Sequence, residues 1–128
     1  MAENKEYYTQ EMENGSIQIS EDVVASVTGM AVLEVEGVCG LSSSIGTDIA
    51  EMLGMKTLSK GVRLSTTETG ALRIDCDVVS KFGQNIFELA KNVQENVKSS
   101  VESVTGLRVA EVNVTVCGIA LPKKGTAL

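Results

Sequence analysis

The sequence predicts an α+β protein, a two-layer α/β sandwich in which two main helices cover one face of a four-stranded, mostly antiparallel sheet. Apolar residues alternate with polar ones in four short segments, and they recur at helical spacing in two longer ones. These segments follow one another in a β-α-β-β-α-β order. Strands with one apolar and one polar face place helices on the first and solvent on the second. A ferredoxin-like arrangement is one topology compatible with this order.

The length of 128 residues is typical of a single domain, which we place at residues 16–121. Residues 1–15 carry four glutamates against one lysine and show no periodicity, so they are predicted to form a mobile acidic leader. Residues 122–128 begin with the only proline of the chain and are predicted to be a mobile tail.

The first strand and the first helix are predicted from Ser16 onward. Alternation of Ile17 and Ile19 indicates a short strand over residues 16–20. Ser20 can cap the helix that follows, and Gly37 is suited to end it. The apolar stripe of this helix consists of Val23, Val24, Val27, Ala31 and Val35.

The middle of the chain is less regular until residue 61. Residues 40–44 have loop composition, and a short amphipathic helix is predicted to end near Gly54. Residues 61–66 and 72–79 then alternate in polarity on either side of a turn at residues 68–70. These two segments predict an antiparallel hairpin, with its second strand the clearest in the sequence.

The second helix has signals at both ends. Asn85 can cap its start, and Gly106 occupies the position of a C-terminal glycine cap. Its apolar stripe consists of Ile86, Leu89, Ala90, Val93, Val97, Val101 and Val104. The last strand follows over residues 112–117, and a change of parity predicts a β-bulge near Ala110 or Glu111.

Composition excludes several classes of function. The chain has no histidine, so serine and cysteine nucleophiles that depend on imidazole cannot be assembled within it. Aromatic residues make up 3% and the net charge is −6, which argues against nucleic-acid binding. Neither a signal peptide nor a long apolar run is present, so we expect a cytoplasmic protein without direct membrane insertion. No cofactor or metal site is predicted.

Two residue sets deserve a chemical interpretation. Asp75 and Asp77 project from one face of a strand beside Arg73, and paired carboxylates could hold a cation or share a proton. A solvated sheet face explains them more simply. Cys76 falls in the inward row of the same strand and is predicted to be a buried thiol, whereas Cys117 and Cys39 are predicted to be more accessible.

Several motifs resemble the alkaline shock protein family, the envelope stress response proteins of Gram-positive bacteria. They are GSIQIS with EDVVASVTGMAVLEVEGVCGL at residues 15–41, LSKGVRL at residues 58–64, and KFGQNIFELAKNVQENVKSSVESVTGLRVAEVNVTVCGI at residues 81–119. The resemblance implies a small protein without known enzymatic activity. It also implies that some members are held at the inner membrane surface by a small membrane-anchored partner and self-associate there, and that others are linked to lipid synthesis.

The leading hypothesis is therefore a self-associating scaffold in envelope homeostasis that docks on a membrane-anchored partner. The alternatives are a regulator of lipid metabolism, a sensor of small apolar ligands, and an enzyme that uses Cys39 or the two aspartates. We expect the contact surface to be an exposed strand edge or the polar face of the sheet. That face is predicted to consist of Arg63, Arg73, Asp75, Asp77, Asn113 and Thr115.

Overall fold

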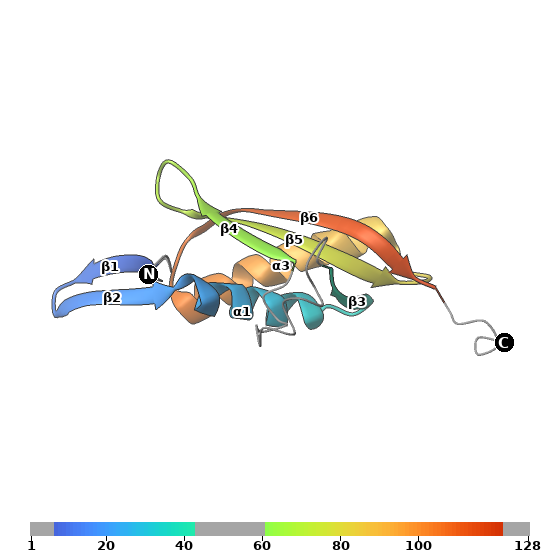
Figure 1. Cartoon of the computed structure of the whole chain (residues 1–128), viewed down its shortest axis with the longest axis horizontal. Coiled ribbons are helices and arrows are strands. Elements are labelled where there is room, and N and C mark those ends of the chain that lie inside the picture. Colours follow the sequence, from blue (N-terminus) through green and yellow to red (C-terminus); the bar gives the residue numbers. More distant parts are fainter. Residues whose placement is uncertain (1–6, 43–60, 122–128) are drawn as a thin grey trace, which may run out of the picture.

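The computed structural model describes residues 7–42 and 61–121, which form two layers (Figure 1). Helices α1 and α3 lie on the same face of a four-stranded sheet, as predicted. The elements are β1 (Tyr7–Met12), β2 (Gly15–Ser20), α1 (Glu21–Leu33), β3 (Val38–Leu41), β4 (Val62–Thr66), β5 (Leu72–Lys81), α3 (Ile86–Thr105) and β6 (Val109–Ala120). Within these ranges, no helix is both long and apolar enough to cross a membrane.

Strand β5 is the centre of the sheet. It pairs in parallel with β6 on one side and antiparallel with β4 and β3 on the other. Along this second side, the partner of β5 changes from β4 to β3 at Asp77. The Asp77 N–H donates to the carbonyl of Gly61, just before β4, and the Asp77 carbonyl accepts from the N–H of Ser42, just after β3, both at 2.9 Å. Helix α3 connects β5 to β6 and returns the chain to the end of the sheet where β5 begins. Strand β6 therefore runs in the same direction as β5, which makes the pair parallel. The predicted four-stranded, mostly antiparallel sheet is thus confirmed.

The fourth strand of this sheet is not the one that the sequence predicts. Residues 16–20 do form a strand, but β2 pairs with β1 in a separate two-stranded sheet. The fourth strand is β3, whose residues 40 and 41 we predicted to be loop. The ferredoxin-like arrangement is therefore wrong, because β3 takes a place in the sheet that the prediction assigned to residues 16–20.

The β1–β2 hairpin also corrects the prediction of a mobile leader over residues 1–15. Residues 7–12 pair with residues 15–20, and the hairpin projects beyond the end of the main sheet (Figure 1). Tyr8 and Ile19 pack against the core, which anchors the hairpin, while Ile17 is 50% exposed. Residues 1–6, the predicted tail 122–128 and the predicted helix ending near Gly54 lie outside the described residues.

Both helices begin at the predicted caps. The Ser20 hydroxyl accepts a hydrogen bond from the Val23 N–H at 3.3 Å, and the Asn85 side chain accepts one from the Glu88 N–H at 3.0 Å. Gly106 is the left-handed cap of α3. The buried side of α1 is rotated from the predicted stripe, because Val23 is 47% exposed. Its buried residues are Val24, Ala25, Thr28, Gly29, Ala31 and Val32.

The core lies between the sheet and the two helices. From β5, Ile74, Cys76 and Val78 point into it with no exposed surface. The helices supply Val24 and Val32 from α1 and Leu89, Val93, Val97 and Val101 from α3, all at most 3% exposed. Within residues 7–42 and 61–121, these side chains pack together in one apolar cluster between the sheet and the helices.

The predicted β-bulge is confirmed at Ala110. Leu72 lies opposite Val109 whereas Arg73 lies opposite Glu111, so Ala110 is the extra residue in β6. A second irregularity follows at Cys117, between the pairs that involve Val116 and Gly118. The first bulge places Glu111 on the same face as Asn113 and Thr115.

Candidate functional site

The face of the sheet turned away from the helices carries all six residues that the sequence proposed as a contact surface. Arg63 lies on β4, Arg73, Asp75 and Asp77 on β5, and Asn113 and Thr115 on β6. In the register, Arg63 and Asn113 lie on either side of Asp75, and Thr115 lies beside Asp77. Neither α1 nor α3 covers this face (Figure 1). We call these six residues together with Glu111 the open face.

The strongest contact on the open face joins β4 to β5. Arg63 donates two hydrogen bonds to the Asp77 carboxylate, Nη1 to Oδ2 at 2.8 Å and Nη2 to Oδ1 at 3.2 Å. The hydrogen bond and charge of Asp77 raise the pKa of the Arg63 guanidinium above its ordinary value. The Arg63 side chain is 59% exposed and that of Asp77 17%, so this is a surface ion pair with good bidentate geometry.

A second group of contacts joins β5 to β6. Arg73 Nε donates to Glu111 Oε1 at 3.3 Å. The Asn113 amide nitrogen donates to Asp75 Oδ1 at 2.9 Å and to Glu111 Oε1 at 3.3 Å. Glu111 is thus a member of the open face that the sequence interpretation missed. The predicted β-bulge could have indicated this role, because the position of the bulge decides on which face of the sheet Glu111 lies.

These contacts bear on the chemistry of the two aspartates. Asp75 accepts from Asn113 and Asp77 accepts from Arg63, so each carboxylate already has a protein partner. Within residues 7–42 and 61–121, no group of three His, Cys, Asp or Glu side chains could hold a metal ion. The arrangement can therefore recognise a partner through charge and hydrogen bonds, and it favours the interpretation as a solvated sheet face.

The three cysteines lie in different environments. Cys76 is fully buried, as its place in the inward row predicts, and burial raises the pKa of its thiol to about 12. Cys39 and Cys117 are exposed free thiols, and the Cys117 sulfur lies 3.5 Å from the Val78 carbonyl oxygen. The buried thiol is protonated at neutral pH and packs as a small apolar side chain.

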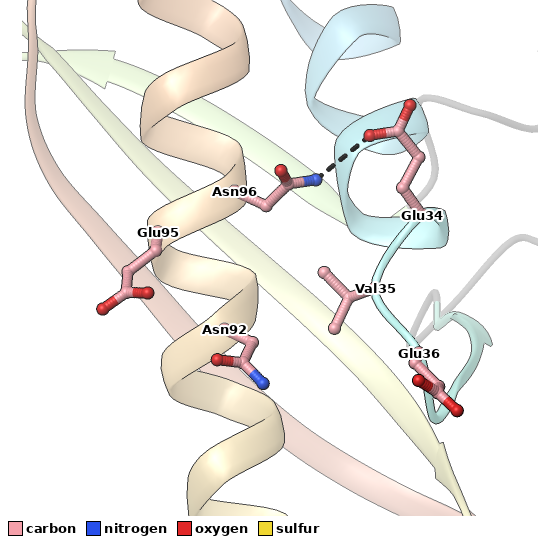
Figure 2. A pocket seen from close by; sticks show the side chains of 6 residues that line it. All are labelled: Glu34, Val35, Glu36, Asn92, Glu95 and Asn96. Carbon is pink, nitrogen blue, oxygen red and sulfur yellow. Dashed lines mark hydrogen bonds between the residues drawn. The ribbon is translucent and has the colours of Figure 1, made fainter.

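A hollow of about 420 Å³ lies between the end of α1 and the middle of α3 (Figure 2). The Asn96 amide nitrogen ties the two helices together, donating to the Ala31 carbonyl at 2.7 Å and to Glu34 Oε1 at 3.2 Å. Glu95 points away from Glu34 and Glu36 in Figure 2, so the three carboxylates do not converge. The hollow is lined by Glu34, Val35, Glu36, Asn92, Glu95 and Asn96.

Comparison with known proteins identifies the family. The model of the alkaline shock protein 23 family, which is described as having a cell envelope-related function, matches residues 9–121. The chain belongs to this family. The match confirms the resemblance found in the sequence, and it includes most of the β1–β2 hairpin as well as the whole sandwich.

Relatives in Gram-positive bacteria match over most of their length. The uncharacterized protein YqhY of Bacillus subtilis is 31% identical over 110 residues, which cover 86% of this chain and 81% of that protein. The uncharacterized protein Spy1614 of Streptococcus pyogenes is 37% identical over 108 residues, covering 83% of this chain and 88% of that protein. The uncharacterized protein YloU of Bacillus subtilis is 36% identical over 107 residues, covering 82% and 88%.

Similarity to solved structures is weaker. One structure of MamM-CTD is 15% identical and superposes with a TM-score of 0.47, covering 77% of this chain and 98% of that chain. A second variant of the same domain gives a TM-score of 0.46 over 80% of this chain and 96% of that chain. At this level the similarity carries no conclusion about function.

Proposed function

We propose that this protein is a non-enzymatic, self-associating scaffold of cell-envelope homeostasis that docks on a small membrane-anchored partner. Membership in a family of cell envelope-related function supports the cellular role. The observation that carries the docking step is the open face, a polar surface on three paired strands that neither helix covers. We place the protein in the cytoplasm, recruited to the inner face of the membrane by that partner.

The charge pattern of the open face suits recognition of a partner with both signs of charge. The positive charges of Arg63 and Arg73 lie among the negative charges of Asp75, Asp77 and Glu111, and every one of these ionic groups already has a hydrogen bond. The Arg73 and Glu111 side chains are 41% and 46% exposed, and exposed ion pairs of this kind contribute only about 0–1 kcal/mol to folding. Their charges can therefore be exchanged with little loss of stability, whereas the complementarity to a partner is lost.

The test exchanges one charge pair without changing the net charge. Tagged wild-type protein and the Arg73→Glu/Glu111→Arg double variant are used to capture partners from detergent-solubilised cells of the native organism, with mass spectrometry of the products. We expect the wild type to enrich a small membrane protein and the double variant to lose it. The matched control Glu88→Lys/Lys91→Glu makes the same exchange on exposed positions of α3 and should retain it.

Two results would contradict the docking proposal. The wild type could enrich no membrane protein at all, which would remove the membrane-anchored partner. The double variant could instead capture that protein as well as the wild type does, which would exclude the open face as the docking surface.

A further inference from the structure

Strand β6 forms one long edge of the four-stranded sheet. Among the described residues it pairs with β5 alone. In a parallel pair, alternate residues direct their N–H and C=O groups toward the neighbouring strand and the others direct them away. The Val112 carbonyl accepts from the Gln94 side chain at 2.9 Å instead of from β5, so it points away from the sheet. Val114 and Val116 share this orientation because they follow at steps of two.

Side chains of α3 form hydrogen bonds with the outward backbone groups in the first half of this edge. Glu102 accepts from the Val109 N–H at 2.9 Å, and Lys98 donates to the Val109 carbonyl at 3.2 Å. Together with Gln94, these side chains cover the outward groups as far as Val112. Beyond that residue, the described part of the chain offers no hydrogen-bond partner to the outward groups of Val114 and Val116.

The uncovered half of the edge is also free of charge. No charged residue occurs from Val112 to Leu121, although the chain as a whole has a net charge of −6. Open edges are commonly protected from pairing by charged side chains or proline. Residues 112–116 carry neither, and they form a regular stretch between the bulges at Ala110 and Cys117.

Phe87 provides a second, independent feature beside this edge. It lies two helical turns before Gln94 on the same side of α3. Because Lys98 reaches Val109 and Gln94 reaches Val112, earlier residues of α3 lie beside later residues of β6. Phe87 therefore lies toward the uncovered half of the edge, and it is 74% exposed. A large aromatic side chain in this position is suited to an apolar contact.

We propose that the uncovered edge of β6, residues 112–116, pairs antiparallel with the same edge of a second copy around a two-fold axis. This inference rests on the proposed self-association and names the surface responsible for it. An edge without charge can approach its own copy without bringing like charges together, whereas most of this acidic surface cannot. The pairing satisfies the outward groups of Val114 and Val116 and gives Phe87 an apolar neighbour.

Amide hydrogen exchange tests the proposal residue by residue. The Val114 and Val116 amides point to the edge, whereas the Thr115 amide bonds to β5 and serves as an internal control. At concentrations where ultracentrifugation shows a dimer, we expect the Val114 and Val116 amides to exchange at least about tenfold more slowly than in the dilute monomer. The Thr115 amide should be protected in both samples.

Three results would overturn the proposal, and they are distinguishable. A dimer in which the Val114 and Val116 amides still exchange rapidly would place the contact elsewhere and leave self-association standing. Equal protection of these amides in monomer and dimer would show that the chain covers its own edge. A monomer at every concentration would remove the proposed self-association as well.

A pair of variants provides a second test. Thr115→Lys places a lysine of each copy close to the two-fold axis, where like charges repel, and it should raise the dimer dissociation constant at least about tenfold. Ser65→Lys adds the same charge to the same face on β4 and should leave this constant unchanged. The reverse pattern, or no effect of either variant, would overturn the proposal.

Discussion

At the residue scale, Cys76 couples the stability of the fold to alkaline pH. Its thiol has no exposed surface, and burial raises its pKa from an ordinary value near 9.0 to about 12. The folded state thus holds the proton more tightly than the unfolded state does. The stability that this provides is complete below pH 9 and is lost as pH rises toward 12, at about 1.4 kcal/mol per pH unit.

The pH dependence can be measured by denaturant unfolding at pH 7.5, 9.5 and 10.5. We expect the free energy of unfolding of the wild type to fall more steeply above pH 9 than that of Cys76→Ala. Because other groups titrate in the same range, the difference between the two proteins is the quantity that reports on Cys76. Cys39→Ala removes an exposed thiol and should retain the wild-type slope. Parallel slopes for Cys76→Ala and the wild type would show that the thiol is not responsible.

Sequence alternation is a reliable guide to which way a residue points on a long, regular strand. On β5 it predicted that Cys76 points inward and that Asp75 and Asp77 point outward, and the structure confirms this. Glu111 was not predicted to join them. A bulge reverses the parity of a strand, and a local pattern locates the extra residue only to within one position.

At the element scale, the junction of β3, β4 and β5 depends on Gly61. This residue has φ +75°, and a Cβ atom there would meet the Ser42 carbonyl oxygen. Gly61→Ala should therefore destabilise the fold by about 2 kcal/mol or more, measured by denaturant unfolding. Gly40→Ala is the matched control, since Gly40 on β3 has open space around it. Equal effects of the two substitutions would show that the junction does not need glycine.

The helices and the β4–β5 hairpin could be predicted because their determinants are local. Caps at Ser20, Asn85 and Gly106 define the start of α1 and both ends of α3 within a few residues of sequence, whereas α1 ends at Leu33 and not at the predicted Gly37. Strand β1 was missed even though Asn14-Gly15 is a strong turn signal between two short segments. Strand β3 gives little signal of its own, because four residues with an internal glycine do not show an alternation.

At the scale of the whole molecule, the choice of strand partners could not be predicted. Strand β2 pairs with β1 close by in sequence, whereas β3 pairs with residues 78–80 of β5, far along the chain. Either β2 or β3 could complete the four-stranded sheet and still leave an apolar sheet face against the helices. Polarity patterns therefore do not distinguish the two arrangements. Alternation within each strand was enough to place six members of the open face on one side of the sheet. The order of the strands depends on pairing between distant segments, so the sequence did not show which edge of the sheet stays unpaired.

Self-association is the step on which the proposed scaffold depends, and sedimentation velocity tests it most directly. Purified full-length protein is compared over a wide concentration range at neutral pH. We predict reversible, concentration-dependent conversion of the 13.5 kDa monomer to a dimer or larger species. A single 13.5 kDa species at every concentration would contradict the scaffold proposal.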